Sequence, residues 1–355
     1  MADSLSAPTT LDRRSERIRA TAGRSAGLAV LLLACVVFFS ASSPYFATTS
    51  NAFTLFRIAS EAGLIAIGMS LVIASGGIDL SVGAIFSLSS VTLGVLFSHG
   101  VPISRCVAVA ALVGLGCGLL NGLIVVVLRI HPLLVTLGTL ALFRGLALGI
   151  SNGSGIAGFP TSFEVVGQGY VSIVPAQCLL WLAVIAVAVF VTTRTAAGRS
   201  LVAVGANETA ARFSGVRVAL ARLTVYGVAG LLSGIAAVIY TSRVLSSRAD
   251  AGNGLELLAI AAVVVGGASI QGGQISIVRT TLAVIAIATI PNGFVLSGYS
   301  TSWQYVAIGL VMIVAVVFNE GLATRVFNFV ARRRAAPPEP SRDRLEKEEA
   351  HVEHG

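Results

Sequence analysis

The residues that could do chemistry are few, and most of them lie in one polar stretch, residues 194–222. Glu208 is the carboxylate of this stretch, several arginines surround it, and Asn207 directly before it is a favourable helix N-cap. Gly215 suits the position just after a helix end. The pattern predicts a short capped helix of about seven residues, roughly 10 Å long, which is too short to cross a bilayer. Such a helix suits contact with a soluble partner; the alternative is a structured cytoplasmic loop that only follows the positive-inside rule.

The composition argues against nucleotide, metal or nucleic-acid chemistry within this chain. Lys347 is the only lysine, so a phosphate-binding loop of the G-x-x-x-x-G-K-[ST] type cannot form. The four cysteines and four histidines make no close ligand cluster, and no basic segment carries the interleaved aromatic residues of a nucleic-acid surface. We therefore expect no catalytic residues, no metal site and no cofactor here. If ATP is used, a separate subunit must bind it with its Mg²⁺.

The remaining sequence is that of an integral membrane protein. Of 355 residues, 55% are hydrophobic and only 11% are charged. The apolar runs predict an all-α, polytopic protein with about ten transmembrane helices, some interrupted by Gly-rich breaks. The expected spans are about 26–39, 52–74, 80–97, 107–128, 133–150, 177–191, 223–240, 257–267, 280–296 and 303–318.

The arginine clusters predict the topology and the domain limits. Ten spans place both termini and the 194–222 loop on one side, which the excess of arginine marks as cytoplasmic. Residues 1–24 are expected to be a disordered cytoplasmic arm, and residues 25–330 a single transmembrane domain. Residues 331–355 are basic, then Pro-rich, then acidic, and are expected to be a disordered cytoplasmic tail.

Two Gly-rich breaks interrupt the apolar runs. In the first, Gly76 and Gly77 end a helix, Asp79 is expected to cap the next one, and Gly83 follows. The second break aligns with the first without a gap, which is the mark of a duplicated transporter core, although chance could also produce it. Its matching residues are Gly266, Gly267, Ser269 and Gly273.

Some polar residues lie inside the predicted spans. Arg57 and Glu61 are four residues apart, which favours a structural ion pair along one helix over a functional site. Asn121 lies beside a Gly-x-x-x-Gly face formed by Gly114, Gly118 and Gly122, where helices can pack closely and an amide can bond across them. Arg144 either extends to the outer interface or takes part in a transport pathway.

The stretch from Gly198 to Gly215 closely resembles the coupling loop of the permease subunits of bacterial ABC sugar importers of the ribose/xylose/galactose type. The strings Gly68–Ile73, Gly76–Gly83 and Thr136–Gly145 match the same family. The wider importer motif begins with the acidic residue, where this chain has Thr209, and which acidic residue would meet the ATPase therefore stays open. The resemblance implies contact with an ATP-binding subunit through Gly198, Arg199, Gly205, Asn207, Glu208, Ala210, Ala211, Arg212 and Gly215.

The resemblance further implies a multi-pass protein of the bacterial inner membrane that translocates a monosaccharide or related small polyol. Its partners would be a second permease copy, the ATP-binding subunit and a periplasmic or lipid-anchored sugar-binding protein, which the outer loop 151–174 would receive. A proton- or sodium-coupled secondary transporter is the main alternative. It would need buried ionisable residues, for which Glu61, Asp79 and Arg144 are the candidates. A membrane scaffold without transport is a third option.

Overall fold

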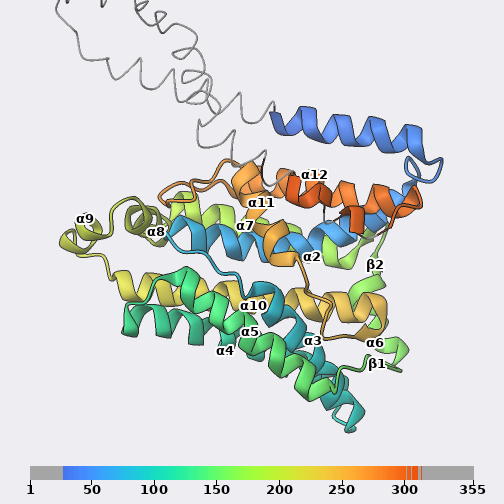
Figure 1. Ribbon diagram of the computed structural model, residues 1–355, viewed down its shortest axis with the longest axis horizontal. Helices are drawn as coiled ribbons and strands as arrows, with labels where there is room; N and C mark the ends of the chain where they lie inside the picture. The colour runs from blue at the N-terminus through green and yellow to red at the C-terminus, as the bar shows by residue number, and fades with distance from the viewer. Residues whose placement is uncertain (1–26, 301, 305, 311–312, 314–355) are drawn as a thin grey trace, which may run out of the picture.

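The computed structural model describes residues 27–300, 302–304, 306–310 and 313, and every statement below concerns this part of the chain (Figure 1). The two arms expected at residues 1–24 and 331–355 lie outside it, as does part of the tenth expected span. The described chain is a helical bundle with only short strands. Its helices are Gly27–Ser42, α2 (Thr49–Ala74), α3 (Val82–Ser98), α4 (Ile103–Leu128), α5 (Pro132–Ser151), α6 (Thr161–Gln168), α7 (Ala176–Arg194), α8 (Ala196–Ala206), α9 (Glu208–Phe213), α10 (Val218–Val244), α11 (Leu255–Val265) and α12 (Ile277–Leu296).

Six of these helices are long and apolar enough to cross a membrane: α2, α4, α5, α7, α10 and α12. Each coincides with one of the expected spans. The helix Gly27–Ser42, α3 and α11 are shorter, and they occupy the positions of three further expected spans. The all-α, membrane-spanning class is therefore confirmed, whereas the count of ten spans stays a prediction.

The centre of the bundle is formed by α2 and α10, with α12 and α11 against α2. The closest helix contact is that of α4 on α10, through the predicted glycine face. A Cβ at Gly114 would collide with the Gly230 carbonyl of α10, and one at Gly118 with the Tyr226 carbonyl, so only glycine allows this approach. Asn121 does bond across helices, since its Nδ2 donates to Ser81 Oγ at 2.7 Å.

The ends of the bundle are different in character. At one end, α8 and α9 connect α7 to α10; at the other lie α6 and the short strands (Figure 1). The strands are β1 (Ile156–Ala157), β2 (Tyr170–Val171), β3 (Val174–Pro175) and β4 (Ser246–Ser247), with β1 antiparallel to β4 and β2 antiparallel to β3. The expected loop at 151–174 is thus held by backbone pairing. The Gly167 N–H also donates to Ser242 Oγ of α10 at 2.8 Å.

The two Gly-rich breaks both end helices, but details of the prediction were wrong. After α2, positive φ falls on Gly76, and after α11 it falls on Gly267. By position after its helix, Gly76 therefore corresponds to Gly267, whereas the gap-free alignment had set Gly76 against Gly266. Asp79 is not the cap of α3, which starts after Ser81. Its Oδ1 instead accepts hydrogen bonds from the backbone N–H and the hydroxyl of Ser81, at 2.9 and 2.7 Å.

Candidate functional site

The polar stretch forms two helices where the sequence predicted one. Arg194 is the last residue of α7, and α8 begins after Thr195, whose Oγ1 accepts from the Gly198 N–H at 3.3 Å. Gly198 is buried because its Cα lies against the backbone of α7 near Thr192. The signal that could have revealed α8 was a Thr cap followed by apolar residues at helical spacing, Leu201 and Val204.

The short helix α9 is capped as predicted. Asn207 Oδ1 accepts from the Ala210 N–H at 2.9 Å and so satisfies a free donor of the first turn. Gly215 has φ +83°, and its N–H donates to the Arg212 carbonyl at 3.1 Å. The Val216 N–H then returns to the Ala211 carbonyl at 3.0 Å, which completes the C-terminal turn.

Glu208 is occupied within the segment itself. Its two carboxylate oxygens accept from Arg212, one turn along α9, and from Arg222 on α10, each at 2.8 Å. Arg222 is the last residue of the polar stretch, and its pairing with Glu208 was not predicted from the sequence. The link ties the start of α9 to α10, and Arg212, with 63% of its side chain exposed, faces outward from α9.

One side of α9 is anchored and the other is free. Ala211 is buried against Val204 of α8 and Val218 of α10. Ala210 and Arg199 are exposed, and Phe213 has 90% of its surface exposed. An aromatic ring this exposed beside a charged residue is typical of a contact surface. Sequence reasoning did not single out Phe213.

The Gly-rich breaks meet the anchored side of this segment. A Cβ at Gly205 would collide with the Ala74 carbonyl at the end of α2 and approach the Gly273 nitrogen. The Gly273 N–H donates to that same carbonyl at 3.1 Å, and Gly272 lies against Gly76. Gly266 packs on the first turns of α12, and Gly77 faces the Tyr226 hydroxyl. The end of α8 is therefore in backbone contact with the breaks after both α2 and α11.

A groove of about 610 Å³ lies beside α9. It is formed by α8, the turn 214–217 and the first turns of α10, and it is lined mainly by apolar side chains. Together with Phe213 it provides an apolar surface next to a cationic one. Such a surface suits a protein partner and offers no side chains for covalent chemistry.

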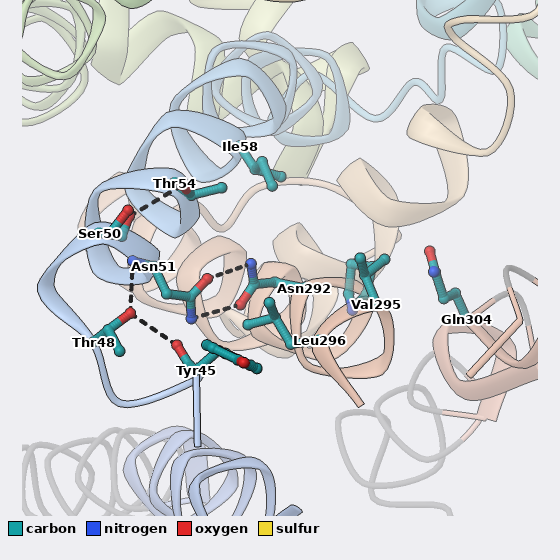
Figure 2. A pocket seen from close by; sticks show the side chains of 11 residues that line it. Tyr45, Thr48, Ser50, Asn51, Thr54, Ile58, Asn292, Val295, Leu296 and Gln304 are labelled. Carbon is teal, nitrogen blue, oxygen red and sulfur yellow. Dashed lines mark hydrogen bonds between the residues drawn. The ribbon is translucent and has the colours of Figure 1, made fainter. Parts of the chain in front are cut away.

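A second cavity, of about 680 Å³, lies where the N-terminal end of α2 meets the C-terminal end of α12, away from α9. Figure 2 shows Asn51 and Asn292 side by side, exchanging hydrogen bonds of 3.1 and 2.9 Å between their amides. Thr48, Ser50 and Gln304 add hydroxyl and amide groups to the lining of the cavity. The two amides satisfy each other, so the pair joins α2 to α12.

The predicted Arg57–Glu61 ion pair is absent. Glu61 pairs with Arg243 on α10, and Arg57 donates to the Gln168 carbonyl at 2.9 Å and lies over the Tyr170 ring at 4.7 Å. Packing between helices gives each of the two residues a partner on another element in place of its neighbour along α2. Arg144 approaches Glu256 of α11 to 4.0 Å, and so it does not extend freely to the interface.

Outside the spans, Arg248 donates two hydrogen bonds to Asp250, at 2.9 and 2.8 Å, and these lower the pKa of that carboxyl. Within the described residues, no group of three or more His, Cys, Asp or Glu side chains is placed to hold a metal ion.

Comparison with known proteins gives a family. The family model described as "Branched-chain amino acid transport system / permease component" matches residues 51–316. The ribose import permease protein of Bacillus subtilis is 38% identical over 81% of this chain and 90% of its own length. The autoinducer 2 import system permease protein of Yersinia enterocolitica is 36% identical over 77% of this chain and 85% of its own length. The D-allose transport system permease protein of Escherichia coli is 35% identical over 82% of this chain and 89% of its own length. No solved structure matches.

Proposed function

Since this chain belongs to the family of transport-system permease components, we propose that it is the membrane subunit of an ATP-driven importer for a monosaccharide or related small polyol. The names of the ribose and D-allose permeases support this substrate class. ATP would be hydrolysed by a separate subunit, because the only lysine, Lys347, lies in no phosphate-binding loop. A second copy of the chain would complete the pathway. Membership of the family makes the chain a multi-pass membrane protein.

The observation that carries the proposal is the capped helix α9, which is exposed on one side and packed against α8 and α10 on the other. Its outward side chains, Arg212 and Phe213, would enter a cleft of the ATP-binding subunit. Its inward side is fixed by the Glu208–Arg222 ion pair and by Ala211. A displacement of α9 would therefore move α10 directly and would move the ends of α2 and α11 through α8. These connections would let ATP binding and hydrolysis change which end of the pathway is open.

The proposed orientation follows from the two ends of the bundle. The end that carries α8 and α9, with Arg199, Arg212 and Arg217, would face the cytoplasm. The end that carries α6 and the paired strands would then face outward and receive a sugar-loaded binding protein, either periplasmic or lipid-anchored.

The test is ATP hydrolysis by liposomes that hold this chain and its ATP-binding subunit, with and without binding protein loaded with D-ribose or D-allose. Wild type is compared with Phe213→Ala and Arg212→Ala, and with Phe190→Ala as a control at an exposed phenylalanine of α7, outside α9. We expect the binding protein to stimulate hydrolysis in wild type and Phe190→Ala, and the other two variants to lose about tenfold in stimulated hydrolysis because they bind the ATPase less well. Equal stimulation in all four proteins would contradict the role of α9. Uptake that follows a proton or sodium gradient without the ATPase would contradict the importer itself.

A further inference from the structure

Two helices of the bundle begin in its interior. The central helices α2 and α10 have 26 and 27 residues, whereas α3 has 17 and α11 has 11, or about 26 and 16 Å. The chain returns from the end of α2 to α3 through residues 75–81, and from the end of α10 to α11 through residues 245–254. After each return segment, the next helix begins inside the bundle and not at its end.

Contacts of the return segments fix where those starts lie. Ser81, just before α3, is bonded by Asn121, which is seven residues from the end of α4 and so about 10 Å from it. The second return segment runs back along α3: Ser247 Oγ donates to the Ser90 carbonyl at 2.8 Å, and the Gly252 N–H to Ser87 Oγ at 3.0 Å. It therefore delivers the first turn of α11 to the first turn of α3.

The two helices then run in opposite directions. α3 leads toward the outer end, where Phe97 stacks on Phe159 at 5.1 Å. α11 leads toward the end where Gly272 and Gly273 meet Gly205. Two positive helix ends thus lie together in the interior of the bundle, a position at which interrupted-helix transporters bind polar substrates.

A carboxylate lies where the two helices begin, and one of its oxygens lacks a hydrogen bond within the described part of the chain. Glu256, in the first turn of α11, has 11% of its side chain exposed, and its Oε2 has no hydrogen-bond partner among the described residues. A Cβ at Gly83 would collide with that oxygen, so the glycine makes room for it. Gly83 was expected near the pathway as a helix break, whereas it lies within the first turn of α3 and accommodates this carboxylate.

Arg144, the cation that faces this carboxylate, makes no hydrogen bond to it. Arg144 Nη2 on α5 is 4.0 Å from Glu256 Oε1, which is beyond hydrogen-bond distance. The Arg144 side chain is 34% exposed, so it is less enclosed than that of Glu256. A separated pair inside a membrane protein is costly unless another group completes it.

A sugar hydroxyl is such a group, because it donates to a carboxylate and accepts from a guanidinium at once. We propose that Arg144 and Glu256 bind hydroxyl groups of the transported polyol where the starts of α3 and α11 meet. This assignment rests on the proposed function. In it, the Arg144–Glu256 pair determines which arrangement of hydroxyl groups a transported sugar must have. The uncharged substrate needs no counter-ion, because Arg144 and the two helix ends already offset the carboxylate.

The experiment uses the same liposomes and the sugar, D-ribose or D-allose, that the wild-type system takes up faster. The variants are Glu256→Gln, Arg144→Gln and the double variant, with Asp250→Asn as a matched carboxyl-to-amide control in an exposed ion pair. Uptake and stimulated ATP hydrolysis are measured in parallel, and deoxy analogues of the sugar compete for uptake. Failure of the wild type to take up either sugar would overturn the proposed function, and this assignment with it.

If the assignment is correct, each single variant loses about tenfold or more in uptake while stimulated hydrolysis stays near wild type. The double variant is no better than the singles, and wild type but not the variants discriminates against one deoxy analogue. A purely structural pair gives other results. Then uptake and hydrolysis fall together with thermal stability, the neutral double variant recovers uptake, and the deoxy selectivity does not change. Either that pattern or unchanged uptake in the single variants would overturn the assignment.

Discussion

Arg243 of α10 donates hydrogen bonds from Nε and Nη2 to the two carboxylate oxygens of Glu61 on α2, at 2.6 and 3.0 Å. This bidentate pair lies between the two central helices, and the Glu61 side chain is almost completely buried. Removing one partner leaves an uncompensated charge in the bundle. We expect Arg243→Gln to lower the free energy of unfolding by about 3 kcal/mol, measured by denaturation of the purified protein in detergent.

The control for this pair is Arg248→Gln, because Arg248 also makes a bidentate bond to a carboxylate, Asp250, but on the exposed surface. It should change stability little. If both variants unfold alike, the Glu61–Arg243 pair does not hold α2 to α10.

Gly205 should tolerate no side chain. Its Cα faces the Ala74 carbonyl and the Gly273 nitrogen, so a methyl group would push α8 away from the end of α2. We expect Gly205→Ala to cost about 1–3 kcal/mol by overpacking and to abolish stimulated ATP hydrolysis. Gly116→Ala is the matched control, since a Cβ at Gly116 on α4 meets nothing within 4 Å. Stimulated hydrolysis of wild-type size in Gly205→Ala would show that α8 does not transmit motion through this contact.

The Asn51–Asn292 amide pair (Figure 2) predicts strong non-additivity. Either asparagine changed to Leu leaves a buried amide without its partner, at a cost of about 1–3 kcal/mol. Changing both to Leu should cost less than the sum of the single changes, because no unpaired amide remains. A double-mutant cycle on thermal unfolding measures the coupling. Additive effects would mean that the two amides do not depend on each other.

Gly215 is needed for its backbone conformation, because a Cβ there would meet no atom within 4 Å. Its φ of +83° costs a β-branched residue about 1–2 kcal/mol, whereas Asn adopts this region more readily. Gly215→Val should therefore impair the end of α9 and reduce stimulated ATP hydrolysis, and Gly215→Asn should largely retain it. The two substitutions are compared in the same liposome assay. Equal activity in both would show that the turn after α9 can change without loss of coupling.

The sequence by itself determined the features that depend on neighbours along the chain. Apolar length predicted the membrane-spanning helices, and Asn207 and Gly215 predicted the ends of α9, because helix caps are local hydrogen bonds. The glycine spacing of Gly114 and Gly118 predicted a close-packing face, since residues four apart share one side of a helix.

Only the tertiary structure decided which distant groups meet. Glu61 pairs with Arg243 and not with Arg57, and Glu208 pairs with Arg222, because an ion pair forms with the partner that the packing of the helices brings near. The contact of Gly205 with Gly273, and the arrival of Glu256 beside Gly83, depend on return segments that carry no periodic signal. The starts of α3 and α11 could thus be placed in the interior of the bundle only once the long helices were packed.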